Sequence, residues 1–291
     1  MARHFLTGEE LSAADLGGLL DRALEMKKTP GEQGDSLQGR SVALVFEKPS
    51  TRTRVSFEVG VAELGGTPVV LRGDELQLTR GESVADTGRV LSRYVAAIAI
   101  RSGSDEAVSE LAESAAVPVI NALTPRHHPC QALADLLTLR ERFGSLDGVK
   151  VAFLGDGNNV ARSLAILGKT AGIELVVAAP EGYRLEDELG VEQTDDPAAA
   201  AKGADALYTD VWVSMGDEGE AEKRRADLAP YQLNAELLAQ ASDRAIALHC
   251  LPAHPGEEIS EEVLYGDRSA VWDQAENRLH AQKALLELLL S

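Results

Sequence analysis

Short apolar runs alternate with segments of helical spacing in the first half of the chain. The apolar runs lie at 43–47, 67–71, 96–101 and 117–121, and helices are expected after positions 50, 81 and 104. Strands that alternate with helices form a parallel sheet whose two faces are covered. The first half of the chain therefore predicts one α/β domain.

The same alternation restarts after the turn signal Asp147-Gly148, with apolar runs at 150–155, 174–179, 205–211, 245–250 and 269–273. Leucines at helical spacing predict a helix over 131–143, long enough to connect two domains, and a last helix over 275–290. Stretches 31–39 and 217–225 have the composition of exposed loops. We predict two doubly wound parallel-sheet domains, 1–134 and 135–274, with helix 275–291 packing back on the first.

Charge limits the classes of partner. The 291 residues include 28 Lys+Arg and 47 Asp+Glu, which gives a net charge of −19, so neither nucleic acid nor an anionic membrane is an expected partner. No apolar run has the length of a membrane span, and the first residues lack a signal-peptide profile, so we expect a cytoplasmic protein. An anionic substrate would need a local arginine cluster.

Two cysteines, Cys130 and Cys250, lie far apart in the sequence and do not form a disulfide framework. The chain has no CxxC, no HExxH and no acidic calcium loop. We therefore expect no metal site.

The string FEKPSTRTRVSFEVG at 46–60 follows an apolar strand and opens a helix. Ser50, Thr51 and Thr53 supply hydroxyl groups where free N–H groups already favour a phosphate. Arg52 and Arg54 add guanidinium groups that match phosphate oxygens. An ordinary N-cap followed by solvated arginines explains any one of these residues. Two arginines in a first turn oppose the helix dipole, so the whole string favours an oxyanion site.

Further polar residues follow the neighbouring strands of the first half. Arg101 ends one apolar run, and His128 and Gln131 lie in RHHPCQ, just before the connecting helix. Imidazole and amide groups there can bond a carbonyl or phosphate oxygen. On this motif alone, a pair of surface histidines is an equally good interpretation.

The turn GDGNNVARS at 155–163 also follows a strand and opens a helix, which raises a dinucleotide site as an alternative. The fingerprint is incomplete, because Val160 stands where the third glycine belongs and no acid ends the next strand. The adjacent amides of Asn158 and Asn159 suit a small polar ligand better.

Two more strand ends carry reactive groups. TDVWVSMG places Asp210 at a strand end, where a carboxylate can bind an ammonium group, and Ser214 and Met215 in the loop that follows. HCLPAHPGEE ends another strand with the thiol of Cys250, flanked by His249 and Pro252. A buried structural cysteine is the ordinary interpretation of such a thiol, and its position beside the other polar loops weakens that interpretation.

Taken together, STRTRVSFE, HPCQ, DVWVSMG, HCLP and AENRLH resemble the aspartate/ornithine carbamoyltransferase family over nearly the whole chain, and the last three resemble its ornithine branch. The resemblance implies that carbamoyl phosphate is bound by Ser50, Thr51, Arg52, Thr53, Gln77, Arg101, His128, Gln131, Cys250, Leu251 and Arg278. It implies that ornithine is bound by Asn159, Asp210, Ser214 and Met215.

The resemblance also implies an activity. The carbamoyl group would pass from carbamoyl phosphate to the δ-amine of L-ornithine, giving L-citrulline and phosphate for arginine biosynthesis, with no cofactor and no metal. The expected catalytic residues are Arg52, Arg101, His128, Asp210 and Cys250. The expected assembly is a homotrimer, or a multiple of trimers, in which the 77–82 loop reaches a neighbour's site.

Three alternatives stay open from the sequence. The first is a carbamoyltransferase for another amine, such as putrescine or an acylated ornithine. The second is an NAD-binding oxidoreductase that uses the GDGNN turn. The third is a non-catalytic anion-binding paralogue, against which Asp210 and the SMG and HCLP strings argue.

Overall fold

The computed structural model describes residues 2–29, 35–73, 81–213 and 218–291. The chain divides into two compact units, and each is described by itself. The first unit comprises Met1–Leu137 and Asn277–Ser291, and the second comprises Thr138–Glu276. Both divisions fall inside helices, α5 and α11.

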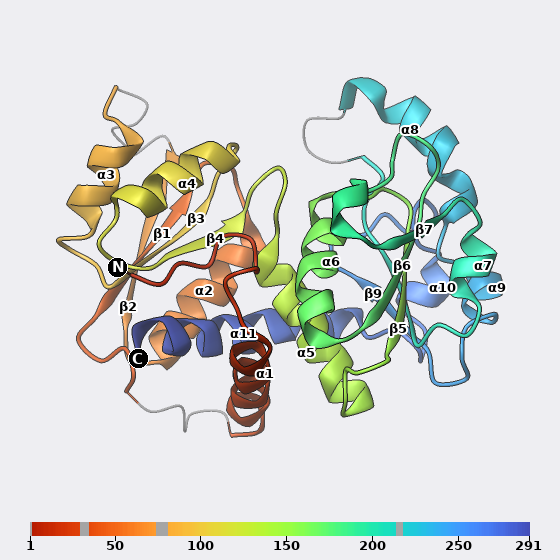
Figure 1. Cartoon of the computed structure of the whole chain (residues 1–291), viewed down its shortest axis with the longest axis horizontal. Coiled ribbons are helices and arrows are strands. Elements are labelled where there is room, and N and C mark those ends of the chain that lie inside the picture. Colours follow the sequence, from red (N-terminus) through yellow and green to blue (C-terminus); the bar gives the residue numbers. More distant parts are fainter. Residues whose placement is uncertain (1, 30–34, 74–80, 214–217) are drawn as a thin grey trace. The chain divides into compact units, whose positions relative to one another are not determined.

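The first unit contains a four-stranded sheet and its covering helices (Figure 1). Its elements are α1 (Ala13–Lys28), β1 (Ser41–Phe46), α2 (Thr51–Glu63), β2 (Thr67–Arg72), α3 (Val84–Leu91), β3 (Ala97–Arg101), α4 (Asp105–Ser114), β4 (Val119–Leu123), the start of α5 (Pro129–Phe143) and most of α11 (Val271–Leu290).

The strands of this sheet run in the order β2-β1-β3-β4, and all pairs are parallel. Helices α3 and α4 cover one face, and α2 and α11 cover the other (Figure 1). Strands β1 and β3 are buried and are continuous apolar runs, as the sequence predicts for a parallel sheet, whereas the edge strand β2 is partly exposed. The register pairs Phe46 of β1 with Arg101 of β3, so Arg101 lies beside the turn that opens α2.

The second unit contains a five-stranded sheet. Its elements are β5 (Lys150–Leu154), α6 (Asn159–Ala171), β6 (Glu174–Ala178), η3 (Asp187–Leu189), β7 (Glu192–Thr194), α7 (Pro197–Ala201), β8 (Ala206–Thr209), η4 (Glu218–Glu220), α8 (Ala221–Leu228), η5 (Ala229–Tyr231), α9 (Ala235–Leu238), β9 (Ile246–His249) and α10 (Glu261–Leu264).

The strands of the second sheet run in the order β7-β6-β5-β8-β9, again all parallel. Helix α6 covers one face, and α7, α9 and α10 cover the other (Figure 1). Thr209 pairs with Leu154 on one side and with His249 on the other. The residues that follow β5, β8 and β9 therefore meet at one edge of the sheet.

The predicted fold class is confirmed, and eight of the nine predicted strands are present. The ninth, at 269–273, is wrong, because Ser269 makes only an isolated bridge to Ala247 and α11 begins at Val271. The predicted loop at 217–225 is also wrong from Glu218 onward: η4 and α8 occupy it, and Leu228 is the buried residue of α8. Strand β7 was not predicted, because Glu192–Thr194 is short, polar and at the edge.

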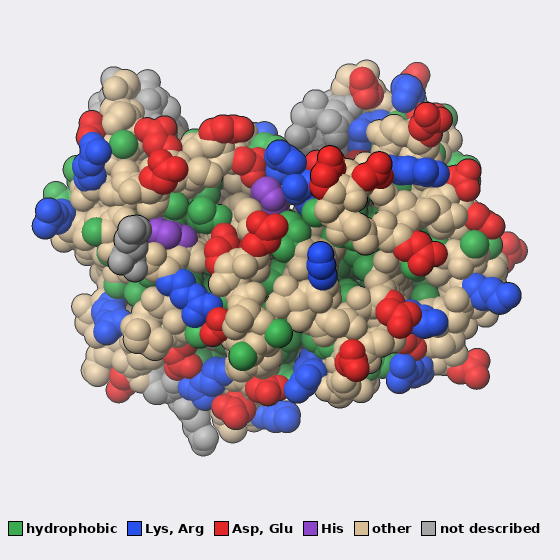
Figure 2. Space-filling model, in the orientation of Figure 1, with side chains coloured by type: hydrophobic (Ala, Val, Ile, Leu, Met, Phe, Trp, Pro, Cys, Tyr) green, Lys and Arg blue, Asp and Glu red, His purple; other side chains and the backbone are tan. Residues whose placement is uncertain are grey.

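Acidic side chains are spread over the drawn surface (Figure 2), in keeping with the net charge of −19. Within the described ranges, no helix combines the length and the apolar character needed to cross a membrane.

Candidate functional site

The turn between β1 and α2 leaves hydroxyl and amide groups of the helix start open to a ligand. Ser50 is the N-cap of α2 and has extended backbone, but its side chain makes no capping hydrogen bond. Its oxygen instead accepts a hydrogen bond from Nη1 of Arg101, over 3.2 Å. Thr51 and Arg52 are exposed, and a cavity of about 610 Å³ opens beside Ser50 and Thr51. N–H groups at such a helix start bind anions.

A buried network fixes the remaining side chains of this turn. Arg278 of α11 donates from Nη1 to Oε1 of Gln131 over 2.7 Å and from Nη2 to Oγ1 of Thr53 over 3.1 Å. Gln131 in turn donates from Nε2 to Asp135 over 2.8 Å. Thr53, Gln131 and Arg278 are all at most 3% exposed. Three segments far apart in the sequence are thus held in one hydrogen-bonded group.

The electrostatics of this group favour an anion. Burial, together with the nearby charges of Arg278 and Arg52, lowers the pKa of Arg101. Burial and the charges of Arg278, Arg101 and Arg52 hold the pKa of His128 well below 6.5, so this imidazole is neutral at pH 7. A neutral imidazole can donate one hydrogen bond. Three clustered guanidinium groups repel one another, and a bound oxyanion stabilises them by neutralising part of their charge.

Arg54 forms an ion pair within its own helix. Its Nε donates to Oε1 of Glu58, one turn along α2, over 3.0 Å. The charge of Arg54 is therefore largely neutralised on its own helix, whereas Arg52 acts on Arg101 and His128.

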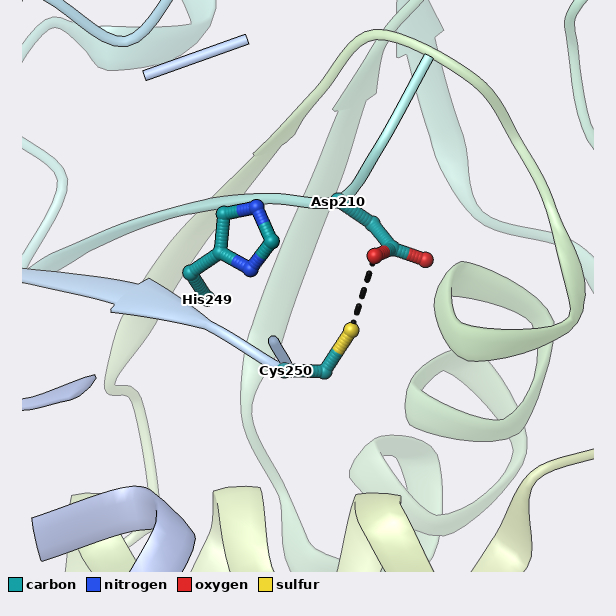
Figure 3. A group of neighbouring side chains, drawn as sticks. All are labelled: Asp210, His249 and Cys250. Carbon is teal, nitrogen blue, oxygen red and sulfur yellow. Dashed lines mark hydrogen bonds between the residues drawn. The ribbon is translucent and has the colours of Figure 1, made fainter. Parts of the chain in front are cut away.

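The second unit brings Asp210 and Cys250 together at the edge of its sheet. The thiol of Cys250 points toward Asp210 and donates to Oδ1 over 2.8 Å (Figure 3). The same oxygen accepts from the backbone N–H of Val211, and Oδ2 accepts from Nδ2 of Asn158 over 2.7 Å. Asp210 is 8% exposed, so its carboxylate is held in one orientation with little contact to solvent.

Asn158 links this carboxylate to α6. It is the N-cap of that helix, and its Oδ1 accepts from Val160 and Ala161 while its amide donates to Asp210. Asn159, one of the predicted ligand residues, is the first residue of α6 and is half-buried. The sequence interpretation missed the link from Asn158 to Asp210; the signal was an amide at a predicted helix start.

A buried acid supports the segment that carries Cys250 and Leu251. His249 is fully buried; its Nδ1 accepts from the N–H of Leu251 over 2.8 Å, and its Nε2 lies 3.0 Å from Oε1 of Glu258. Leu251 has a left-handed backbone, with φ of 58°. Burial raises the pKa of Glu258, and hydrogen bonds from His249 and the His254 N–H outweigh it, so the pKa lies below its usual value. Glu258 was not predicted, and no local pattern marks it.

Two groups of potential metal ligands occur among the described side chains, Asp210 with His249 and Cys250, and His254 with Glu257 and Glu258. In the first, both ring nitrogens of His249 already make hydrogen bonds and the thiol is bonded to Asp210. In the second, Oε2 of Glu257 accepts from Nε of Arg225. These contacts give both groups a structural explanation without an ion.

The glycine-rich turn after β5 packs against the chain itself. A Cβ on Gly157 would lie 2.7 Å from the carbonyl oxygen of Tyr183 and 2.8 Å from the nitrogen of Leu185. The second glycine of a dinucleotide fingerprint instead admits a pyrophosphate. The close approach therefore weakens the dinucleotide alternative.

Three of the predicted ligand residues, Gln77, Ser214 and Met215, lie outside the described residues. In the first unit, direct hydrogen bonds join Ser50 to Arg101, and a second set joins Thr53 and Gln131 to Arg278. It brings Asp210 and Cys250 together in the second. Each of the two parallel-sheet units thus carries a cluster of polar side chains beyond the carboxyl ends of its strands, which is where enzymes of the two-domain α/β class bind their ligands.

The chain belongs to the aspartate/ornithine carbamoyltransferase family. Residues 3–141 match the family's carbamoyl-P binding domain, and residues 147–289 match its Asp/Orn binding domain. The predicted family is therefore confirmed.

Three similar proteins that match over nearly their whole length are ornithine carbamoyltransferases. The ornithine carbamoyltransferase of Acidothermus cellulolyticus is 54% identical, covering 100% of this chain and 97% of its own. That of Parafrankia sp. is 52% identical, covering 99% and 96%. The solved structure of ornithine carbamoyltransferase from Pyrococcus furiosus is 48% identical with a TM-score of 0.94, covering 99% of this chain and 96% of its own.

Proposed function

We propose that this enzyme transfers the carbamoyl group of carbamoyl phosphate to the δ-amine of L-ornithine, releasing L-citrulline and phosphate. The observation that carries the proposal is the cluster of Arg52, Arg101 and Arg278 beside the start of α2, where hydrogen bonds fix Arg101 and Arg278. Burial, together with the charges of this cluster, lowers the pKa of His128. The ornithine carbamoyltransferases that match over their full length support ornithine as the amine.

Carbamoyl phosphate binds the first half-site. The start of α2 and the Arg52 guanidinium hold the phosphate, while Arg101, His128 and Thr53 direct hydrogen bonds to the carbonyl oxygen. Arg278 donates to both Thr53 and Gln131, and these three side chains complete the polar wall. The full set proposed to bind this substrate is Ser50, Thr51, Arg52, Thr53, Gln77, Arg101, His128, Gln131, Cys250, Leu251 and Arg278.

Ornithine binds the second half-site. Its α-ammonium group pairs with the carboxylate of Asp210, which Asn158 and Cys250 hold in place. A carboxylate that is fixed by hydrogen bonds is a stronger partner for a cation than a mobile one, because less order is lost on binding. Asn159, Ser214 and Met215 complete the proposed ornithine set.

The transfer is an acyl substitution. The neutral δ-amine attacks the carbonyl carbon, the C–N bond forms, and the C–O bond to phosphate breaks with its electron pair leaving on the phosphate oxygen. The amine loses one proton in the process, and the departing phosphate accepts it, so that the product leaves as the dianion HPO4²⁻. Arg101, His128 and Thr53 stabilise the oxyanion, and a donor of this kind contributes about 3–4 kcal/mol to lowering the barrier. Positioning supplies much of the remainder.

The decisive assay measures carbamoylated product from carbamoyl phosphate with ornithine, putrescine, aspartate and N-acetylornithine in parallel. We expect citrulline from ornithine and little product from the other three. A higher turnover with putrescine or N-acetylornithine would establish the alternative amine instead. Addition of NADH tests the oxidoreductase alternative, and we expect no change in its fluorescence.

We propose a cytoplasmic homotrimer, or a multiple of trimers, with a role in arginine biosynthesis. One relative, from Pyrococcus furiosus, is named an anabolic ornithine carbamoyltransferase and is 48% identical to this chain, which supports the biosynthetic direction. Size-exclusion chromatography with light scattering tests the assembly.

A further inference from the structure

The carboxylate of Asp105 binds three groups of one distant turn. Asp105 is the first residue of α4, and the turn 124–127 connects β4 to α5. Oδ1 accepts from Oγ1 of Thr124 over 2.6 Å and lies 2.9 Å from Nδ1 of His127, while Oδ2 accepts from the N–H of Arg126 over 3.1 Å. Every residue of the turn except Pro125, which has no N–H, is thus held by this side chain.

The turn leads directly to a proposed ligand of carbamoyl phosphate. His128 follows His127, and its carbonyl oxygen accepts from the N–H groups of Gln131 and Ala132 in the first turn of α5. The backbone from Thr124 to His127 is closed by the N–H of Thr124, which donates to the carbonyl oxygen of His127 over 2.8 Å. The position of the His128 imidazole therefore depends on this short closed turn.

The contacts of Asp105 with Thr124 and His127 are partly buried, and all three of its contacts are charge-assisted. The side chains of Asp105 and His127 are 21% and 12% exposed, and Thr124 is fully buried. Burial by itself would raise the pKa of Asp105. The hydrogen bonds from Thr124, His127 and the Arg126 N–H have a larger combined effect in the opposite direction, so the pKa lies below its ordinary value of 3.8. The group is ionised at neutral pH, and hydrogen bonds to an ionised group are about twice as strong as neutral ones.

An ordinary helix-start role does not account for this arrangement. Ser104 already caps α4 through the N–H of Ala107, and Glu106 supplies a second acid in the first turn. Favourable interaction with the helix dipole needs only a carboxylate near the N-terminus. It does not need one that bonds to residues 19–22 positions away.

We propose that Asp105 is a positioning residue for carbamoyl phosphate: it fixes the 124–127 turn and thereby places His128 against the substrate oxyanion. The inference rests on the proposed function, because it assigns His128 to carbamoyl phosphate. Its role is to hold the turn, and it is not among the residues proposed to bind substrate.

The test compares Asp105→Asn with Asp86→Asn. Both residues lie in the first turn of a helix of the same unit. Among the described residues, the contacts of Asp86 are local: its N–H donates to Ser83 and its Oδ1 accepts from Arg89. Asparagine keeps the shape but removes the charge and one acceptor. Loss of one charge-assisted bond predicts an increase in KM for carbamoyl phosphate of about tenfold or more in Asp105→Asn, with KM for ornithine changed less than about twofold. Asp86→Asn should leave both constants unchanged.

A second pair of variants covers the case in which Asp105→Asn does not fold. Thr124→Val removes the hydroxyl group that donates to Asp105, whereas Thr124→Ser keeps it. We expect Thr124→Val to raise KM for carbamoyl phosphate selectively and Thr124→Ser to retain most of the wild-type value. In the double variant Asp105→Asn/His127→Gln, the change in KM for carbamoyl phosphate should be smaller than expected from the two single variants, since both changes remove the same contact.

The outcomes separate the two proposals. A wild-type enzyme that forms no citrulline from ornithine would overturn the proposed function. An active wild-type enzyme together with unchanged or equal shifts of both KM values in Asp105→Asn and Thr124→Val would overturn only the positioning role. Selective loss of carbamoyl phosphate affinity in either pair supports it.

Discussion

The thiol of Cys250 donates a hydrogen bond to Oδ1 of Asp210 over 2.8 Å. The two residues are 40 positions apart, and they follow the ends of two different strands, β9 and β8. The bond holds the carboxylate of Asp210 in one orientation, with the thiol as its donor. A thiol in this arrangement serves to orient the carboxylate, whereas nucleophilic attack would require the thiolate.

Asp210→Asn should weaken ornithine far more than carbamoyl phosphate. The amide keeps the size of the side chain and removes the charge that pairs with the α-ammonium group. We expect KM for ornithine to rise by roughly tenfold to a hundredfold, the equivalent of about 1.5–3 kcal/mol for a hydrogen bond to a charged group. Initial-rate kinetics with each substrate varied in turn measure the effect. Cys250→Ser, which keeps a donor, is the matched milder variant; equal losses for both substrates in Asp210→Asn would contradict the assignment.

Arg52→Ala should abolish most carbamoyl phosphate binding and leave the fold intact. Arg52 is exposed at the start of α2, so its removal opens no cavity, but it withdraws a bidentate charge-assisted contact to phosphate. Isothermal titration with carbamoyl phosphate measures the binding, and the thermal midpoint checks the fold. Arg54→Ala is the control, because Arg54 pairs with Glu58. Near-normal binding of carbamoyl phosphate by Arg52→Ala would contradict the proposed phosphate site.

His128 should make the fold less stable as the pH falls. Its pKa in the folded protein lies well below the value of 6.5 expected when it is unfolded. Above pH 6.5 both states are neutral; below it only the unfolded state gains the proton, so stability is lost with falling pH. The loss approaches about 1.4 kcal/mol per pH unit for one group.

The measurement for His128 is the pH dependence of unfolding in the wild type and in His128→Asn. As the pH falls from about 7 to about 5, the unfolding free energy of the wild type should fall more steeply than that of His128→Asn, so the stability of the variant relative to the wild type should increase. Arg278→Gln removes one of the charges that lower the pKa of His128, and should raise the titration midpoint of the His128 ring signals in NMR spectra. Parallel pH curves for wild type and His128→Asn would count against a depressed pKa.

Gly157→Ala should destabilise the second unit. A Cβ there would lie 2.7–3.0 Å from backbone atoms of Tyr183, Arg184 and Leu185, and backbone cannot rotate away as a side chain can. Overpacking of this kind costs about 1–3 kcal/mol. Gly18→Ala is the matched control, since nothing lies within 4 Å of its Cβ position in α1, and it should be neutral or stabilising by up to about 1 kcal/mol. Urea denaturation compares the two, and equal stability would disprove the close approach at Gly157.

Mixed oligomers test whether Gln77 acts in a neighbour's site. Arg52→Ala and Gln77→Ala are each expected to be inactive alone. After dissociation and reassociation together, sites built from two chains should regain a fraction of activity, because some sites carry neither lesion. Verified mixing without regained activity would place Gln77 in the site of its own chain.

The local pattern of the sequence was sufficient for most elements and for the types of residue in the site. Apolar runs of β-branched residues predict strands such as β1 and β3, and the turn at 50–53 combines hydroxyl and guanidinium groups within one helical turn. The prediction failed at 269–273, because a run of five residues with apolar members fits either a strand or the first turn of a helix. Which one forms depends on the neighbouring elements and not on the run itself.

Only the tertiary structure decided how distant residues meet. Arg278 bonds Thr53 across 225 positions and Gln131 across 147, and Asn158 reaches Asp210 across 52. Strand order and register, which set these encounters, arise from packing between elements and leave no periodic trace in the sequence. The sequence by itself determined which reactive groups the chain carries. The edges of the two sheets decided which of these groups lie next to one another. Hydrogen bonds and lowered pKa values require distances of a few ångströms and burial, which only the folded chain provides.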